Sequence, residues 1–507
     1  MTPSSPRTRG LRDALSAFGR PSVDAAPAAA ESAIPAADDC SHLLYARGFL
    51  LAPEPRSLPA PHWRQTRLGR YWFAHDSRTG FALARAGGTW VAVLGRAICL
   101  ETWTDDIAVI ARDLIRAKQT GRTAMLDRID RLSGRFAIFY EEDGATLAQS
   151  DAAGMRAVFY GRRDGCTYVA SHAHLVADCV GEAPSSFPDP QTIRKEHNAY
   201  SFPGRHTNFA RVLALTPNTE LVVEKAEPRR FFPREPLAEH TVADAVDEVL
   251  PLLQRQLAML ADRDPLIVSL TGGLDSRTTL ALTRPLKDRI DYFTYDSRIG
   301  EGALREDSEA AEELSRALGF RHHRIPLLYR MPPEPLAGVM DRNSRRVSAP
   351  GMPATHLQYD GCRGLHIRSN LYEIGRAFYR AKRAQPEPLT PEHMAFLLTN
   401  HKKTPESFAA GFAEFDDATG FSAAAELYDP YDLYYWEHRC GTWLNAHHTE
   451  GDVVYDTFTI LNSRQVYKAL LAVPLEARVA GEAFVEMIRR TWPEALDHPV
   501  NGEMIKA

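Results

Sequence analysis

Two adjacent glycines, closely followed by a carboxylate, form the most distinctive chemical pattern of the chain. The run TGGLDS carries the hydroxyls of Thr271 and Ser276, the glycines Gly272 and Gly273, and the carboxylate of Asp275. An apolar run, PLIVSL, precedes it, and a helical pattern, TTLAL, follows. A turn from strand to helix presents backbone N–H groups at the positive end of the helix dipole, and glycine lets an anion approach the backbone. The pattern therefore predicts a phosphate-binding loop.

Asp275 adds a divalent metal to this prediction. A carboxylate beside a phosphate repels it unless a cation lies between them, and Mg²⁺ is usually bound by carboxylate and phosphate oxygens. The run has no G-K-[ST] and no G-x-G-x-x-G, which excludes a Walker loop and a dinucleotide fingerprint. The alternative is a strand-to-helix connection whose glycines serve only packing.

The elements around this loop predict a parallel sheet. After a Pro-rich stretch at about 226–236, EPRRFFPREP, apolar runs alternate with helical patterns: PLIVSL, TTLAL, RIDYFTY, DSEAAEELSRALG, HHRIPL and GLHIRS. Such alternation indicates βα units, whose functional site lies at the carboxyl ends of the strands. A helix before PLIVSL is expected to begin with a capping box of Thr241 and Asp244, and Pro251 should bend it.

The first half of the chain is typical of β structure. Short apolar runs are separated by turn residues: RYWFAH, GFALA, TWVAVLG, RFAIFYEEDGATLAQSD and TYVASH. In the fourth run, EEDG predicts the turn of a hairpin between RFAIFY and ATLAQSD. A helix is expected near 106–118. The Ala-, Pro- and Ser-rich start, 1–44, predicts a disordered tail, because it offers too little apolar surface to bury.

Composition and charge exclude several classes of function. The 507 residues carry a formal net charge of −5 without a long basic block, so neither nucleic acid nor a membrane surface is expected as a partner. No apolar stretch is long enough to span a bilayer. The six cysteines lie far apart without a C-x-x-C pair, which argues against a zinc site and a disulfide framework. We expect a cytoplasmic protein that acts on a small molecule or a peptide.

At this point TGGLDS resembles the S-G-G-x-D-S pyrophosphate-binding loop (PP-loop) of the ATP pyrophosphatases. Other segments are similar to the asparagine synthetase class, which includes β-lactam synthetases and lasso peptide cyclases: LSGRFAIFY, DAAGMRAVFY, FPGRHTNFARVLALTPNTEL, RRFFP and LNSRQVYKALLAVPLEAR. This resemblance implies an α+β, Ntn-hydrolase-like β-sandwich domain of the type 2 glutamine amidotransferase kind at 45–230. It implies an α/β parallel-sheet PP-loop domain at 237–507, with ATP and Mg²⁺ as cofactors.

The amidotransferase half departs from the pattern of that family. An active domain of this kind has a nucleophilic cysteine directly after the initiator Met, whereas this chain begins Met1-Thr2-Pro3. Cys40 would become terminal only after removal of a leader, and the first half lacks an N-G-E segment. We therefore expect a degenerate glutaminase-like domain, and Cys40 is expected to be an ordinary thiol.

The resemblance assigns further residues to an ATP site. Leu270 and Tyr295 should line the adenosine pocket, at the ends of the first two strands. Asp275 is expected to be catalytic and to hold the metal, together with Asp307, which lies where the family has an acidic residue. For Asp307 the alternative is an N-cap of the helix that runs to Gly319.

The segment GLHIRSNLYEIGRAFYR occupies the place of the family motif S-G-E-G-x-D-E but departs from it. Glu373 matches the last acid and is assigned a catalytic role, whereas Tyr372 replaces the preceding Asp. Ser369 is assigned to the cofactor site. Arg368 and Arg376 could neutralise pyrophosphate in place of a missing carboxylate.

These expectations describe an ATP-dependent amide-forming ligase. A carboxylate of a small molecule or peptide would be activated as an acyl-adenylate, and an amine from an unknown donor would displace AMP, as in asparagine synthesis or a related amidation. One alternative is a cyclase that closes a macrolactam or β-lactam ring on a peptide or metabolite. Another, of a different class, is a non-catalytic relic that binds a nucleotide or a partner. The chain could form a homodimer.

Overall fold

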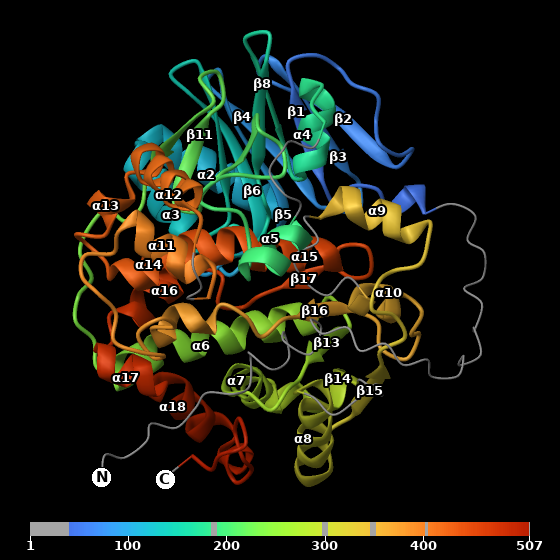
Figure 1. Ribbon diagram of the computed structural model, residues 1–507, viewed down its shortest axis with the longest axis vertical. Helices are drawn as coiled ribbons and strands as arrows, with labels where there is room; N and C mark the ends of the chain where they lie inside the picture. The colour runs from blue at the N-terminus through green and yellow to red at the C-terminus, as the bar shows by residue number, and fades with distance from the viewer. Residues whose placement is uncertain (1–39, 184–189, 297–302, 345–350, 401–403, 506–507) are drawn as a thin grey trace.

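The computed structural model describes residues 40–183, 190–296, 303–344, 351–400 and 404–505. Two antiparallel sheets pack face to face in the first half, and a parallel sheet with its helices forms the second half (Figure 1). An antiparallel sandwich followed by a parallel sheet is the arrangement that the sequence predicts.

The sandwich consists of two six-stranded sheets with the orders β10-β8-β9-β1-β3-β2 and β12-β11-β7-β6-β5-β4. Their strands are Phe49–Ala52 (β1), Trp63–Leu68 (β2), Tyr71–Asp76 (β3), Phe81–Ala86 (β4), Thr89–Cys99 (β5), Leu132–Glu142 (β6), Ala145–Ser150 (β7), Phe159–Arg163 (β8), Cys166–Ala170 (β9), Val212–Ala214 (β10), Thr219–Val222 (β11) and Glu227–Arg230 (β12). The predicted hairpin is confirmed, because β6 and β7 pair antiparallel around the turn at 143–144.

Alternate residues of the strands fill the space between the two sheets. Phe49 and Phe73 of the first sheet contact Phe139 of the second, with ring centroids 5.2 and 5.0 Å apart in edge-to-face arrangements. Helices cover the outer faces: Ile107–Thr120 (α2) and Arg122–Asp130 (α3) pack on the second sheet, and Ala173–Val180 (α4) packs on the first. The helix predicted near 106–118 is confirmed as α2, and Asp106 caps it through the N–H groups of Ala108 and Val109.

The parallel sheet has the strand order β15-β14-β13-β16-β17. Its strands are Leu266–Ser269 (β13), Ile290–Asp296 (β14), His322–Pro326 (β15), Leu365–Ile367 (β16) and Thr457–Phe458 (β17). Every neighbouring pair runs parallel, as the alternation of strand and helix patterns predicts. Both faces of the sheet are buried, because Leu266 and Val268 pack into one hydrophobic core while Ile267 packs into another.

Helices cover both faces of this sheet and extend beyond it. The α-helices are Pro190–His197 (α5), Val242–Ala261 (α6), Leu274–Leu282 (α7), Ala303–Leu318 (α8), Leu336–Asn343 (α9), Gly351–Leu357 (α10), Pro391–Leu398 (α11), Glu406–Thr419 (α12), Phe421–Ala424 (α13), Pro430–Tyr434 (α14), Asn445–Gly451 (α15), Arg464–Leu471 (α16), Leu475–Ala480 (α17) and Glu482–Thr491 (α18). Short 3₁₀ segments occupy Ser41–Leu43 (η1), Arg284–Arg289 (η2), Tyr372–Arg376 (η3) and Pro493–Leu496 (η5), and Tyr435–Leu444 (η4) is a π-helix. The predicted capping box of α6 is confirmed, because Thr241 and Asp244 bond each other's backbone N–H groups.

Two predictions about connecting segments need correction. Of the predicted disordered tail, residues 1–39 lie outside the described part of the chain, but 41–43 form η1 and its Leu43 packs in a small core with Met340 and Val453. Cys40 packs against the same core. In the predicted boundary stretch at 226–236, residues 227–230 form β12, because this strand lies at a sheet edge, where Pro228 costs no ladder hydrogen bond.

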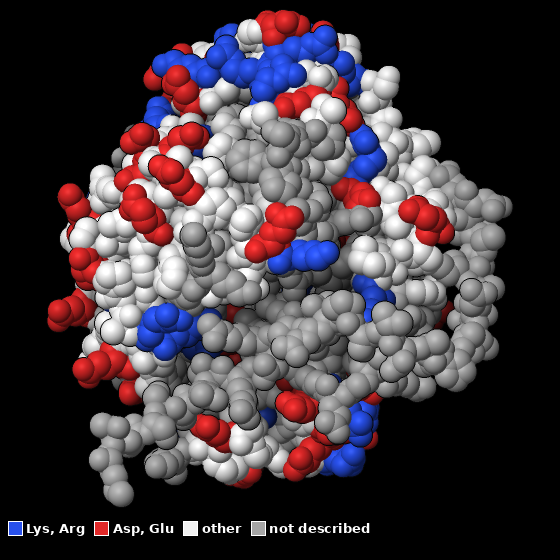
Figure 2. All heavy atoms as spheres, viewed as in Figure 1, with Lys and Arg blue, Asp and Glu red and all other residues white. Residues whose placement is uncertain are grey.

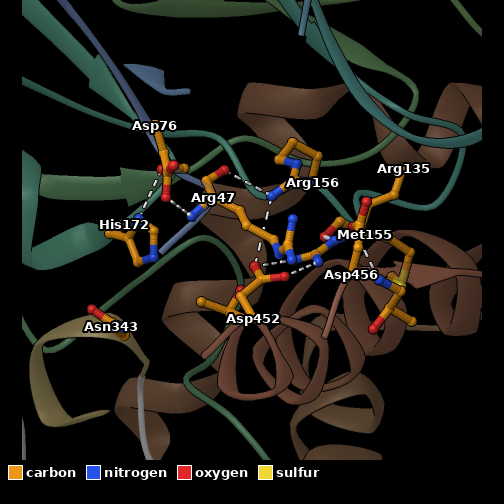
Figure 3. A network of polar contacts seen from close by, with 12 residues as sticks. Arg47, Asp76, Arg135, Met155, Arg156, His172, Asn343, Asp452 and Asp456 are labelled. Carbon is orange, nitrogen blue, oxygen red and sulfur yellow. Dashed lines mark hydrogen bonds and ion pairs between the residues drawn. The ribbon is translucent and has the colours of Figure 1, made fainter. Parts of the chain in front are cut away.

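Buried and half-buried ion pairs join the sandwich to the parallel-sheet half, and Figure 3 shows the buried ones. Arg135 of β6 forms a two-pronged salt bridge with Asp452, and Arg156 lies 3.6 Å from the same carboxylate. Arg96 of β5 bonds Asp264 at 2.7 Å and Asp456 at 3.3 Å. Burial raises the pKa of Asp456, but the surrounding arginines outweigh it and hold that pKa at about 2. These ion pairs connect arginines of the sandwich to aspartates of the parallel-sheet half, and we call this contact the joint.

Charged side chains of both signs are mixed over most of the face in Figure 2. Lys and Arg gather at the top, over the sandwich and at the opposite end of the molecule from α7. Exposed arginines of the sandwich include Arg70, Arg162 and Arg163. Among the described residues, no helix combines the length and the apolar character needed to cross a membrane.

We expect the salt bridge between Arg135 and Asp452 to be a main support of the joint. Both side chains are 2% exposed. Asp452→Ala leaves the Arg135 guanidinium buried with part of its charge uncompensated, so it should lower the free energy of unfolding by about 3–5 kcal/mol. Asp262→Ala, which breaks an exposed pair with Arg289, is the matched control and should change it little. Chemical denaturation followed by circular dichroism measures both, and equal midpoints for the two variants would contradict this role.

Candidate functional site

The glycine run lies at the carboxyl edge of the parallel sheet. The central strand β13 ends at Ser269, and α7 begins at Leu274 with Gly273 as its N-cap residue. The run therefore connects strand to helix between the ends of β14 and β16. The predicted strand, loop and helix are confirmed in this order.

The N–H groups of the loop are bonded to side chains of the protein. The N–H of Thr271 donates to Ser276 Oγ at 3.1 Å, and that of Gly273 donates to Thr271 Oγ1 at 3.3 Å. The N–H of Gly272 donates to Asp307 Oδ1 at 2.8 Å. A carboxylate oxygen thus occupies the acceptor position that the sequence assigned to a phosphate. The three loop N–H groups are therefore occupied, whereas no side chain of the described residues caps the first turn of α7.

Asp307 has a different place from the one expected of a helix cap. The helix α8 begins at Ala303, so Asp307 lies inside it, and the alternative role as N-cap is wrong. The residues 303–306, ALRE, extend the helix beyond the Asp because they form helix readily. Burial raises the pKa of Asp307, although the hydrogen bond from Gly272 lowers it in part.

Packing does not require glycine at either loop position. A Cβ built on Gly272 would lie 3.4 Å from Asp307 Oδ1 at its closest, and one on Gly273 would lie 3.4 Å from Asn501 Oδ1. Neither glycine has a positive φ. Both positions could therefore hold alanine in the fold as it stands, so packing alone does not account for the pair.

A buried group of charges lies on the other side of the loop, at the first turn of α7. Arg376 of η3 donates to Asp275 Oδ2 at 2.9 Å. Burial raises the pKa of Asp275 to about 7, because the attraction of Arg376 offsets burial only in part and the nearby Glu373 adds repulsion. Asp275 Oδ1 and Glu373 Oε2 are buried and have no hydrogen-bond partner within the described residues.

Tyr372 stands where the motif S-G-E-G-x-D-E has an aspartate, and it offers this group no carboxylate ligand. Its ring is fully buried, and its hydroxyl lies 2.8 Å from Thr279 Oγ1 inside the core. Ser369 Oγ is also buried without a partner among the described residues, and so is the side-chain oxygen of Asn370. Of the segment 369–373, Glu373 is the residue that lies near enough to Asp275 to repel its charge.

A pocket of about 730 Å³, measured with its open mouth, lies beside the loop and has Thr271 in its wall. Its walls come from the ends of β13, β14 and β16 and from α8, α10 and α15. They consist of Ser269, Leu270, Thr271, Phe293, Thr294, Tyr295, Leu304, Asp307, Met352, Pro353, His366, Arg368, His447, Glu450 and Tyr455. Leu270 and Tyr295, which the sequence assigned to an adenosine pocket, thus line one cavity together. Arg368, which the sequence assigned to pyrophosphate, also lies in this wall, whereas Phe293, His366 and Tyr455 were not predicted, because these residues converge only in the fold.

The carboxylates fit a magnesium ion in part. Within the described residues, His, Cys, Asp and Glu form no cluster of three or more that could hold a metal by itself. Mg²⁺ in phosphate sites uses one or two carboxylates and takes its other ligands from phosphate and water. Asp275 Oδ1, buried and unbonded, suits such an ion, whereas Asp307 Oδ1 already accepts from Gly272.

Comparisons with known proteins add little to this geometry. No protein-family model and no curated protein matches the chain. One similar solved structure is titled as the allosteric regulatory enzyme of purine biosynthesis, with 11% identity, a TM-score of 0.24 and coverage of 56% of this chain and 60% of that one. Another is a glutamine phosphoribosylpyrophosphate amidotransferase from B. subtilis, with 11% identity, a TM-score of 0.23 and coverage of 79% and 90%. Such scores lie below the level at which whole chains share a fold, so neither activity is carried over.

We expect Gly272→Ala to fold as stably as the natural chain. A Cβ meets no atom closer than 3.4 Å and the backbone has no positive φ, so the free energy of unfolding should change by less than about 1 kcal/mol. Gly95→Ala is the contrasting variant, because a Cβ there would lie 2.3 Å from the carbonyl oxygen of Arg135 and φ is +112°. Thermal unfolding compares the two, and a large loss of stability in Gly272→Ala would restore the packing explanation.

Proposed function

We propose that the chain is an ATP-dependent carbon–nitrogen ligase of the asparagine synthetase type. It would activate a carboxylate as an acyl-adenylate, release pyrophosphate, and let an amine displace AMP. The observation that carries the proposal is the glycine pair between β13 and α7, which the fold itself does not require. Space left bare of side chains beside backbone N–H groups suits an approaching phosphate.

Each assigned residue has a role in this proposal. Leu270 and Tyr295 line the pocket that would take the adenosine. The hydroxyls of Thr271 and Ser276, with the N–H groups of Gly272 and Gly273, would bind the phosphates. Asp275 would hold Mg²⁺ through its unbonded Oδ1, and a bound Mg²⁺ ion would supply charge neutralisation at the leaving pyrophosphate.

The charged group around α7 would provide the remaining electrostatics. Arg376 carries a guanidinium next to Asp275, where it can stabilise negative charge on the phosphates. Glu373 and Ser369 each have an unbonded oxygen, and both would orient the acyl substrate or the incoming amine. Catalysis would depend on positioning and charge more than on proton transfer.

The sandwich would serve as a scaffold in this proposal. Its Ntn-hydrolase-like character and the PP-loop character of the parallel sheet are both part of the inference. The helix–sheet–sheet–helix layering of the first half supports the former, and the loop position supports the latter. The amine would come from ammonia, from another protein or from the substrate itself, and the last case would make the enzyme a cyclase.

A non-catalytic role has one specific observation in its favour. The acceptor position at Gly272 is taken by Asp307, and Asp275 is paired with Arg376, so the loop satisfies most of its polar groups without a ligand. In a protein that only contacts a partner, the contacts of Asp307 with Gly272 and of Arg376 with Asp275 would not interfere with function. Binding of ATP separates the two functions.

We expect titration calorimetry to detect binding of ATP with Mg²⁺ to the full chain. Asp275→Ala should weaken it at least about tenfold, or 1.4 kcal/mol, because the metal loses its carboxylate. Asp288→Ala, at a carboxylate that is 82% exposed outside the site, is the matched control. Release of AMP and pyrophosphate with aspartate, ammonia or peptides would then identify the substrates. Absence of ATP binding to the natural chain would leave the non-catalytic role.

The affinity for ATP with Mg²⁺ should fall as the pH decreases through about 7. Asp275 has its pKa raised to about 7, so acidification protonates the group that holds the metal. The loss should reach at most about tenfold per pH unit, since one proton is taken up. Asp275→Asn cannot titrate and should flatten the profile between pH 6 and 8. A profile that Asp275→Asn leaves unchanged would assign the titration to another group.

Removal of Asp307 should act differently with and without metal. If its carboxylate occupies the place of a phosphate, Asp307→Ala frees the N–H of Gly272 and removes a repelling charge, so ATP should bind several-fold more tightly in the presence of a chelator. The same titration with Mg²⁺ tests the predicted metal role of Asp307. If Asp307 holds the metal, Asp307→Ala should weaken the binding of ATP with Mg²⁺. Weaker binding in chelator would contradict the competition.

A further inference from the structure

Arg368 carries a charge into the wall of the pocket. It follows β16 directly, and its backbone N–H donates to the carbonyl of Phe458 at 3.0 Å, which ties it to the neighbouring strand β17. It lines the pocket together with Thr271 of the glycine run. The sheet therefore fixes the position from which the guanidinium extends.

The guanidinium of Arg368 has little compensation from the protein. It donates to the carbonyl of His447 at a long 3.4 Å, and no ion pair of Arg368 exists in the described part of the chain. Other arginines near the sheet behave differently: Arg376 pairs with Asp275, and Arg135 pairs with Asp452. Burial lowers the pKa of Arg368, and the attraction of Tyr455, Tyr295 and Glu450 offsets this only in part.

Several other polar groups on this wall are bonded to protein atoms, although His366 Nδ1 is buried without a hydrogen bond among the described residues. The Tyr295 hydroxyl lies 3.0 Å from His356 Nδ1, and His366 Nε2 lies 3.0 Å from Ser269 Oγ. The Oε1 atom of Glu450 accepts from Ser344 Oγ at 3.1 Å. Among aromatic and apolar neighbours such as Phe293 and Tyr455, an unpaired cation is costly unless a ligand supplies the anion.

We infer that Arg368 binds an oxyanion of the ligand, either a carboxylate or a phosphate, and so positions the substrate in the pocket. The inference rests on the proposed function, under which both kinds of oxyanion enter this site. A guanidinium suits either one, because its parallel N–H groups match a pair of oxygens. Arg368 faces the pocket, whereas Arg376 lies on the α7 side of the loop, so the two arginines act on different groups.

The test titrates three probes into the full chain: ATP with Mg²⁺, adenosine, and succinate as a simple carboxylate. Arg368→Met keeps a long side chain without its charge. Arg368→Lys keeps the charge but lacks the parallel N–H groups of the guanidinium. Arg363→Met, at an exposed arginine before the same strand, is the matched control. Thermal unfolding of each variant shows that the fold is retained.

If the oxyanion is a phosphate, Arg368→Met weakens ATP at least tenfold and leaves adenosine unchanged. If it is a carboxylate, the variant leaves ATP unchanged and loses succinate binding. Arg368→Lys should recover part of the affinity in either case, and Arg363→Met should resemble the natural chain. Unchanged affinities for ATP and succinate, or an equal loss for ATP and adenosine, would overturn the inference.

The outcome remains separate from that of the proposed function. A natural chain that binds no ATP contradicts the ligase proposal, yet succinate titrated into the ligand-free chain still tests Arg368. If the natural chain then binds succinate and Arg368→Met does not, the result would support an oxyanion site at Arg368 that does not serve an ATP-dependent ligase. Failure of the natural chain to bind either anion would overturn the inference as well.

Discussion

A half-buried backbone N–H group needs an acceptor, and at Gly272 this need connects the loop to a neighbouring helix. Asp307 supplies the acceptor from α8, at 2.8 Å. The same helix contributes Leu304 and Asp307 to the pocket wall. The hydrogen bond between Gly272 and Asp307 therefore connects the glycine run to that wall. An anion that accepted a hydrogen bond from the N–H of Gly272 would have to displace the carboxylate of Asp307. This hydrogen bond would then no longer hold α8 to the loop.

The charges of the site are divided between the two sides of the loop. On the side of α7, Asp275, Arg376 and Glu373 balance one another in part, and unbonded oxygens remain. On the side of the pocket, Arg368 stands among aromatic rings without an ion pair in the described residues. A ligand with its negative charge near the loop and an apolar ring system could satisfy both environments.

The sequence could predict the elements because their signals are local. The apolar run before Gly272, the hairpin turn at EEDG and the capping box at Thr241 each act within a few residues, and the fold confirms them. Short edge strands such as β17 carry too few residues for a periodic signal. The π-helix η4 has no distinct signal either, since its i→i+5 bonds follow from tertiary packing.

The site was predictable only where it coincides with such a local pattern. The glycine run and its place at the sheet edge are of this kind. The hydrogen bond between Gly272 and Asp307 joins residues 35 positions apart, and the pairing of Asp275 with Arg376 spans 101. Those contacts depend on how helices dock, so the sequence suggested the acids without indicating that protein groups already engage them.

The segment between α15 and β17 links the pocket to the sandwich. Asp452 and Asp456 bond arginines of the sandwich, while Tyr455, between them in sequence, lines the pocket. Loss of the first half would leave these two aspartates without their counter-charges and would release the wall that Tyr455 forms. The parallel-sheet half therefore depends on the sandwich for the shape of its pocket, and the two halves form one structural unit at this wall.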